Sequence, residues 1–197
     1  DVSTLTLDQL VSDCHALIGY LCRTLNKEKI FLLGGSWGTQ LGTIVCQKHP
    51  QKIAGYIGYG QVVNGIENEN VSYAFALEKA KEAGCAEDIA ELERVGPPVD
   101  GQYKPVFEGL MTQRRIMKKY GGHSTKGGSY FTGTVLPILK SRELSISDKI
   151  GVSKGYKLCL SHMWPTIVHY DFIRDCGPFQ MPYYIFQGRL DNNTPAS

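Results

Sequence analysis

The chain has 197 residues, of which 42% are hydrophobic and 20% are charged, so one globular domain, with or without an insertion, is expected. The formal net charge of +2 excludes the strong basic surplus that is typical of nucleic-acid-binding proteins. No apolar stretch reaches the ~18 residues of a membrane span, and no signal peptide is recognised at the start. Neither a nucleic acid nor a membrane is therefore expected as a partner.

The cysteines show no pattern of a metal site, because none of them forms a C-x-x-C pair or a zinc-type spacing. We interpret them as buried free thiols of a cytoplasmic protein. No metal and no other cofactor is expected, and the oligomeric state is left open. The six cysteines are Cys14, Cys22, Cys46, Cys85, Cys159 and Cys176.

The first sixty residues alternate between helical and strand patterns. Apolar residues recur at helical spacing over 10–25, after a Thr6–Gln9 pair that is typical of a capping box. The apolar run 30–33 predicts a short strand buried on both faces of a parallel sheet. A second helix is predicted at 37–48 and a second strand at 53–59. This alternation predicts an α/β fold with a parallel sheet and right-handed crossovers.

Helical patterns and loops replace the strand signals from about residue 62 to residue 179. A third strand then follows at 183–187. We therefore expect residues 1–61 and 180–197 to form the sheet-containing core, with residues 62–179 as a helical insertion between its strands. Within that insertion, helices are predicted at 72–83, 86–95, 105–120, 135–140 and 161–171, with glycine loops at 127–128 and 133.

The sequence GGSWG at 34–38 lies directly after the first predicted strand and directly before the second helix. This is the setting of a nucleophile elbow, in which the Ser36 hydroxyl is held above the sheet on a tight turn. Side chains at Gly34 and Gly38 are expected to collide with the neighbouring strand and helix. The Trp37 backbone N–H, at the helix N-terminus, would donate to an oxyanion. A glycine-rich turn with an incidental serine is the alternative, and a phosphate-binding loop is disfavoured because its Lys-Ser/Thr pair is absent.

The run LLGGSWGTQLG at 32–42 resembles the nucleophile elbow of α/β-hydrolases, most closely the proline iminopeptidase-like branch, in which a tryptophan commonly follows the serine. GRLDNNTP at 188–195 resembles the segment that carries the triad acid after a late strand. The helical block matches the cap that these enzymes insert after the strand following the elbow. The resemblance implies an α/β-hydrolase core with a helical cap, and a serine hydrolase that forms an acyl-enzyme.

By this resemblance Ser36 is the nucleophile and Asp191 is the acid that orients a histidine. Asp191 also follows a predicted strand, and the carboxyl ends of parallel strands share the rim on which the elbow lies. The alternative is a turn-forming residue, because Asp-Asn-Asn is turn chemistry. The order in this fold is serine, acid, histidine, yet no histidine follows Asp191. We therefore expect an internal fragment of a longer hydrolase, with the histidine beyond Ser197 and the second oxyanion donor before Asp1.

The five histidines that are present are interpreted as surface or structural residues. A cap histidine that serves Ser36 is conceivable but would break the order of the triad. Without a base the serine stays weakly nucleophilic, so the chain by itself is expected to be inactive. These histidines are His15, His49, His123, His162 and His169.

The predicted substrate is a small peptide with an N-terminal proline or a similar residue. Recognition of its free α-amine calls for carboxylates, and Glu67, Glu69 and Glu78 follow the second strand closely, although solvated helix charges are the alternative. Trp164 is a candidate for an apolar subsite, although aromatic residues at helical spacing also form cores. A carboxylesterase or lipase, and a non-catalytic binding module on the same scaffold, remain alternative functions. A sequence continuing past Ser197 into a strand and a histidine would argue against the binding module.

Overall fold

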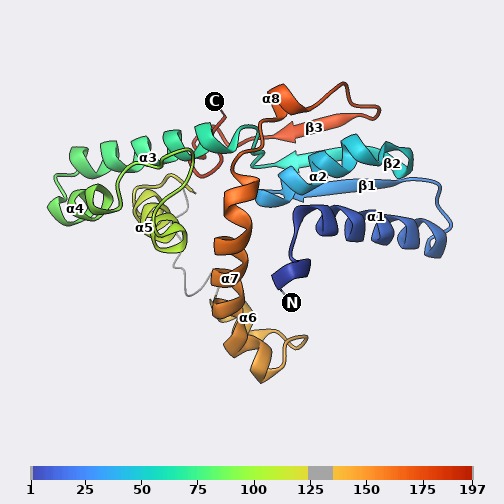
Figure 1. The fold of residues 1–197 in the computed structure, drawn as a ribbon, viewed down its shortest axis with the longest axis horizontal. Coiled ribbons are helices and arrows are strands. Elements are labelled where there is room, and N and C mark those ends of the chain that lie inside the picture. The colour runs from blue at the N-terminus through green and yellow to red at the C-terminus, as the bar shows by residue number, and fades with distance from the viewer. Residues whose placement is uncertain (1, 124–134, 197) are drawn as a thin grey trace.

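The computed structural model describes residues 2–123 and 135–196. Two helices and two strands alternate at the beginning of the chain, and a series of helices separates them from the last strand (Figure 1). In chain order the elements are a 3-10 turn (Val2–Thr4), α1 (Leu7–Thr24), β1 (Ile30–Gly35), α2 (Trp37–Lys48), a 3-10 turn (Pro50–Lys52), β2 (Ile53–Tyr59), α3 (Gly65–Glu82), α4 (Ala86–Val95), α5 (Val106–Lys119), α6 (Leu136–Lys140), α7 (Ile146–Ile167), α8 (Phe172–Asp175) and β3 (Tyr183–Phe186).

The three described strands form one parallel sheet in the order β1-β2-β3. Leu33 pairs with Ile57, and Ile57 pairs in turn with Tyr184, so these residues lie in one row across the sheet. The parallel sheet that the alternation of helices and strands predicts is therefore confirmed. All three strands point toward the helices α3, α4 and α5, so the strand ends that precede α2 and α3 face this helical block (Figure 1).

Helices α1 and α2 pack against one face of this sheet. Their apolar residues join those of the strands in a single core in which Val45 and Tyr56 are fully buried. Removal of these side chains from water is the main stabilising term, at about 25 cal/mol per Å² of apolar surface. The buried residues of this core include Leu7, Val11, Ile18, Cys22, Ile44, Val45, Ile53 and Tyr56.

The expectation that the first strand is buried on both faces is wrong for the described chain. Phe31 and Leu33 are 68% and 63% exposed, whereas Leu32 between them packs against the core. Tyr184 and Phe186 of β3 are also exposed, so one face of the sheet is apolar and uncovered by described residues. A short apolar run does not distinguish a strand with one buried face from a strand with two.

The predicted first helix is present, but two details of the prediction are wrong. Thr6 caps α1 by accepting the Gln9 backbone N–H at 3.2 Å, whereas the Gln9 side chain donates to Asp13 instead of returning to Thr6. The capping box is therefore only half formed. Leu17 and Leu25 are exposed although the apolar spacing places them on the buried face. The buried stripe consists of Leu7, Val11, Ile18, Gly19 and Cys22.

Two helices of the later block begin earlier than the sequence pattern predicts. Helix α3 begins at Gly65 rather than at 72, and α7 begins at Ile146 rather than at 161. Each is capped by a polar residue, Asn64 or Ser145, whose side chain accepts a backbone N–H of the first turn. The first turns of α3, residues 65–70, are mostly polar, so they lack the apolar spacing on which the prediction relies. The glycine loops predicted at 127–128 and 133 lie outside the described residues.

Helices α3, α4 and α5 form a second core of their own, in which Ala80, Leu92 and Ile116 are fully buried. Trp164 of α7 packs against both cores and so joins them. The helical block lies beyond the carboxyl ends of the strands, on the same side as the β1–α2 turn (Figure 1). In the parts of the chain described here, no helix is long and apolar enough to cross a membrane.

Candidate active site

Ser36 occupies the single position between the end of β1 and the start of α2. Its backbone has φ 50° and ψ −126°, a conformation that costs a residue other than glycine about 1–3 kcal/mol. Hydrogen bonds hold this strained turn: Ser36 N–H donates to Tyr59 O at 3.0 Å, and Ser36 O accepts Thr39 N–H at 2.8 Å and Thr39 Oγ1 at 2.6 Å. Ser36 is exposed. The turn is thus the tight strand-to-helix connection that the motif predicts.

The glycines of the motif are not equally constrained. A side-chain carbon at Gly34 would lie 2.5 Å from Tyr56 Oη and 2.7 Å from Gly38 O, so no other residue fits there without movement. At Gly35 it would lie 2.2 Å from the Tyr59 ring. At Gly38 it would meet nothing within 4 Å among the described residues. The predicted collision is therefore confirmed at Gly34, and the prediction is wrong at Gly38. Gly35 is also crowded, although the motif does not require a glycine at that position.

Trp37 is the first residue of α2, so its backbone N–H has no acceptor within the helix. The N-terminus of a helix carries a partial positive charge that favours an anion beside it. The indole ring packs against the core, and its Nε1 is buried without a partner in the described part of the chain. The backbone N–H, rather than the side chain, is thus the group suited to an oxyanion.

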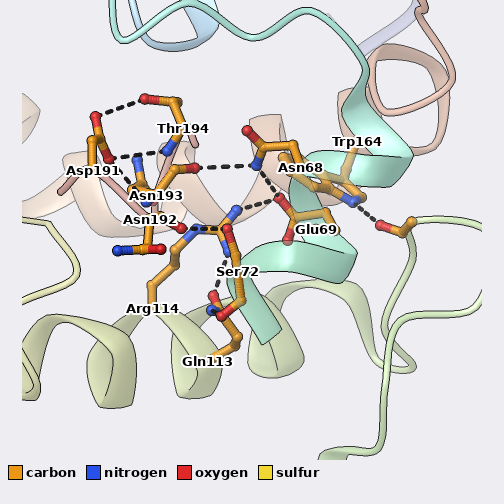
Figure 2. A network of polar contacts seen from close by, with 11 residues as sticks. Asn68, Glu69, Ser72, Gln113, Arg114, Trp164, Asp191, Asn192, Asn193 and Thr194 are labelled. Atoms are coloured by element: carbon orange, nitrogen blue, oxygen red, sulfur yellow. Dashed lines mark hydrogen bonds and ion pairs between the residues drawn. The ribbon is translucent and has the colours of Figure 1, made fainter. Parts of the chain in front are cut away.

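Asp191 lies in the loop after β3, with its carboxylate held by that loop (Figure 2). Oδ1 accepts the backbone N–H groups of Asn193 and Thr194 at 2.9 and 3.1 Å, and Oδ2 accepts Thr194 Oγ1 at 2.8 Å. This is turn chemistry, as the alternative interpretation predicts. A carboxylate has about four acceptor sites, however, so room remains for a histidine N–H. The turn-forming role and the role of a triad acid are therefore compatible.

Gly60, at the end of β2, separates Ser36 from Asp191. A side-chain carbon at Gly60 would lie 3.7 Å from Asp191 Oδ2 and 3.8 Å from Ser36 N. The two groups therefore flank one glycine on the same rim of the sheet. Gly60 has φ 57°, and the same carbon would lie 3.0 Å from Thr194 Oγ1, so both conformation and space favour glycine. Sequence analysis missed Gly60, because a lone glycine after a strand resembles any turn residue.

Further hydrogen bonds unite the ends of the three strands. Gln187 Oε1 accepts the Gln61 backbone N–H at 2.8 Å, and Gln187 Nε2 donates to Thr194 O. Thr39 Oγ1 accepts the Val62 N–H at 3.0 Å, so α2 is hydrogen-bonded to the segment that follows β2. The elbow and the acid loop are thus parts of one connected unit. Sequence analysis missed Thr39 and Gln187, because their partners lie far from them in the chain.

The histidines lie in other surroundings. His15 stacks on His49, with ring centroids 3.9 Å apart. His169 Nε2 lies 2.7 Å from Asp100 Oδ2, and this carboxylate raises the pKa of His169. His123 and His162 are exposed. Within residues 2–123 and 135–196, no histidine forms a hydrogen bond to Ser36 or Asp191.

The proposed substrate-binding residues differ in exposure and in partners. Glu67 and Glu78 are exposed on α3, whereas Glu69 is 1% exposed and its Oε1 forms an ion pair with Arg114. Glu69 Oε2 is buried without a partner in the described part of the chain. Trp164 is partly buried and donates its indole N–H to Gly101 O at 3.1 Å.

Comparison with known proteins identifies the architecture. Residues 8–84 match the family described as "alpha/beta hydrolase fold". This span contains β1, the Ser36 turn, α2, β2 and α3, and it includes all of α1 except Leu7. The chain has an alpha/beta hydrolase fold. The expectation of a hydrolase core with a parallel sheet flanked by helices is therefore confirmed.

Comparisons over nearly the whole chain find similar proteins at low identity. The "Probable aminopeptidase YbaC" of Bacillus subtilis (strain 168) is 21% identical over 194 residues, which are 98% of this chain and 59% of that protein. A proline iminopeptidase-related protein of Thermus thermophilus is 18% identical, with a TM-score of 0.47 over 98% of this chain and 57% of its own. Epoxide hydrolase VrEH1 of Vigna radiata is 17% identical, with a TM-score of 0.43 over 100% of this chain and 60% of its own. The chain thus spans less than two thirds of the length of each.

Proposed function

We propose that the protein is a serine hydrolase in which Ser36 is the nucleophile and Asp191 is the acid of the triad. The observation that carries this proposal is the strained backbone of Ser36 (φ 50°) at the N-terminus of α2. Strain of this kind is concentrated at functional sites, where surrounding contacts hold it. The position of Asp191 on the other side of Gly60 supports the pairing of nucleophile and acid.

The proposed reaction proceeds through an acyl-enzyme. A histidine takes the Ser36 proton as Oγ attacks the substrate carbonyl, and Asp191 holds the resulting imidazolium in the required orientation. The Trp37 N–H donates to the oxyanion of the tetrahedral intermediate. The histidine then protonates the leaving amine or alcohol, and a water molecule releases the acid from Ser36. We expect this histidine to lie after Asp191 in the full-length protein.

The substrate that we favour is a peptide with an N-terminal proline or a similar residue. The resemblance of the elbow to the proline iminopeptidase-like branch supports this choice, together with the aminopeptidase name of the Bacillus relative. The α-amine requires a carboxylate, and Glu69 is the best supported of the three glutamates because it is buried on α3 and its Oε2 lacks a described partner. Glu67 and Glu78 come second because they are exposed, and we place Trp164 at an apolar subsite.

A carboxylesterase is the second candidate, and one observation favours it. The negative charge of Glu69 is already compensated by Arg114, which weakens its attraction for a substrate amine. An ester substrate has no amine to bind and would use the same nucleophile and acid. For either substrate we propose a cytoplasmic location, because all six cysteines are free thiols.

The test uses the full-length protein, a fluorogenic amide of N-terminal proline and a serine-directed fluorophosphonate. Ser36→Ala should abolish turnover and labelling but leave substrate binding largely intact, with a loss in kcat on the order of 10⁴–10⁶. Asp191→Asn should lower kcat by about 10⁴, because the histidine loses its tautomer and orientation. Ser161→Ala, an exposed serine of α7, is the matched control.

The outcomes of this test distinguish the candidate functions. Cleavage of short-chain esters without cleavage of free-amine peptides would retain the triad and replace the aminopeptidase by an esterase. Equal labelling of the wild type and Ser36→Ala would contradict the nucleophile assignment. Substrate binding without turnover or labelling in the wild type would identify a non-catalytic binding module on the hydrolase scaffold.

A further inference from the structure

The first turns of α3 hold the loop that carries Asp191. Asn68 and Ser72 are four residues apart on α3, so they lie on the same side of the helix. Ser72 Oγ donates to Asn192 O at 2.5 Å, and Asn68 Nδ2 donates to Asn193 O at 3.1 Å (Figure 2). Both helix residues are buried. Two successive carbonyl groups of the acid loop are therefore bound by one helix of the helical block.

The peptide units that α3 holds are the same ones that hold Asp191. The 192–193 peptide accepts from Ser72 at its carbonyl and donates its N–H to Asp191 Oδ1 at 2.9 Å. The 193–194 peptide accepts from Asn68 at its carbonyl and donates its N–H to the same Oδ1 at 3.1 Å. Because a peptide unit is planar and rigid, fixing its carbonyl also fixes the direction of its N–H.

Helix α3 is itself anchored to α5. Gln113 Nε2 donates to the backbone carbonyl of Ser72 at 2.7 Å, and Arg114 forms its ion pair with Glu69. The segment after α5 also contacts the acid loop, since Gly122 O accepts the Asn192 N–H at 2.7 Å. The orientation of the acid thus depends on contacts that the helical block provides, in addition to those within its own loop.

We propose that Asn68 and Ser72 are positioning residues for Asp191 and act on its carboxylate through the 192–193 and 193–194 peptide units. This inference rests on the proposed function, because it concerns the acid of the same triad. Loss of either side chain leaves the local turn of Asp191 and Thr194 intact but frees the peptide that aims an N–H at Oδ1. The carboxylate can then turn away from the histidine and stabilises the imidazolium less well, so we expect the pKa of the triad histidine to fall.

The test measures the second-order rate constant of fluorophosphonate labelling of Ser36 across pH in the full-length protein. Ser72→Ala and Asn68→Ala should each lower the plateau rate roughly tenfold, which corresponds to one hydrogen bond, and the double variant should lower it further. The acid limb of the pH–rate profile should move to lower pH in each variant. Ser72→Thr keeps the hydroxyl and should restore both the rate and the limb.

Ser145→Ala is the matched control, because it also removes a serine hydroxyl from the helical insertion 62–179, where Ser145 caps α7. It should lower the melting temperature but leave the acid limb where it is in the wild type. The inference is overturned if Ser72→Ala labels with the wild-type pH profile, or if Ser145→Ala shifts the limb equally. The proposed function fails separately, if Ser36→Ala still labels at the wild-type rate.

Discussion

At the scale of single residues, the candidate site depends on unusual backbone conformations at two neighbouring positions. Ser36 has φ 50° and Gly60 has φ 57°, and each lies at the carboxyl end of a strand. The serine is held there by Tyr59 and Thr39, whereas the glycine adopts the conformation without strain. Gly60 also leaves open the space between Ser36 and Asp191. We therefore expect the site to be more sensitive to a side chain at Gly60 than its position outside the GGSWG motif indicates.

Gly60→Ala should lower fluorophosphonate labelling of Ser36 in the full-length protein by about 10- to 100-fold. The new methyl group would approach Thr194 Oγ1 to 3.0 Å and would lie between the proposed nucleophile and the proposed acid. A displacement of about 1 Å of such groups is enough for a loss of this order. The variant should also lose about 1–2 kcal/mol of stability, because alanine adopts positive φ unfavourably.

Gly84→Ala is the control for the stability that is lost when alanine is placed at a positive φ. Gly84 has φ 62°, and a side chain there meets nothing within 4 Å among the described residues. Both variants should therefore lose similar stability in urea unfolding, whereas Gly60→Ala alone should lose labelling. Equal labelling by both variants would show that Gly60 has no role beyond its turn.

Single residues also show how far the sequence could predict the site. Ser36 and Asp191 were found because a local motif surrounds each of them. Thr39, Gly60, Gln187 and Ser72 were not found, because each acts on a residue that is distant in the sequence or only becomes a neighbour after folding. Nothing in the local sequence distinguishes them from ordinary helix, turn or strand-end residues.

At the scale of elements, boundaries were predictable where apolar spacing and breakers coincide. Helix α2 and β2 have the predicted bounds, because Gly-rich and Pro-containing connections surround them. The starts of α3 and α7 were missed, since tertiary contacts and caps rather than apolar periodicity specify them. Gly65 shows the reason: a side chain there would lie 2.3 Å from Val168 O, so the first turn of α3 packs closely against the chain after α7. Such a contact joins residues about a hundred positions apart and leaves no local signal.

Helices α4 and α5 are joined by Asp88, and this contact predicts a pH dependence of stability. The Asp88 carboxylate is 3% exposed and accepts from Lys119 Nζ at 2.5 Å and Tyr120 Oη at 2.7 Å. The hydrogen bond from Lys119 holds the pKa of Asp88 at about 2, below its ordinary 3.8. Because the pKa is lower in the folded state, the stabilisation is present above about pH 4 and is lost as pH falls toward 2.

Asp88→Asn should therefore lower the free energy of unfolding by about 1–3 kcal/mol at pH 7, since it removes a charge-assisted pair and leaves Lys119 without its anion. The difference from the wild type should shrink between pH 5 and about pH 2. Urea unfolding at pH 7, 5 and 3 measures this trend. Glu93→Gln, an exposed charge on the same helix, should change stability by less than about 0.5 kcal/mol. A constant difference at all three pH values would contradict the assignment.

At the scale of the whole molecule, the sheet and the helical block have separate cores that meet beside the candidate site. Trp164 contacts both cores, and the acid loop accepts hydrogen bonds from Asn68 and Ser72 of α3 and donates one to Gly122 O after α5. The orientation of the proposed acid, Asp191, therefore depends on how the sheet and the helical block are placed relative to each other. We predict that residues 1–61 and 180–197 belong to the sheet part and that residues 62–179 belong to the helical part. Limited proteolysis, with cleavage in the loops that join the two parts, would test these boundaries.

The histidine is the remaining group of the proposed triad. The 197-residue chain has no histidine after Asp191, and in its described parts no histidine forms a hydrogen bond to Ser36 or Asp191. His15 and His49 stack on each other, and His169 pairs with Asp100, so neither arrangement supplies a base at the elbow. The isolated chain should therefore label with fluorophosphonate no faster than its own Ser36→Ala variant, because an unassisted serine hydroxyl is weakly nucleophilic.

Stoichiometric labelling of the isolated chain at Ser36 would contradict this prediction and place the base within the helical block. His123 would then be the first residue to test, rather than His162 or His169. It follows Gly122, whose carbonyl accepts the Asn192 N–H, so it is the histidine joined most directly to the acid loop. His123→Ala should abolish labelling in that case, whereas His162→Ala, an exposed histidine of α7, should leave it unchanged. If the isolated chain does not label but the full-length protein does, the base lies outside these 197 residues, and the serine–acid–histidine order is kept.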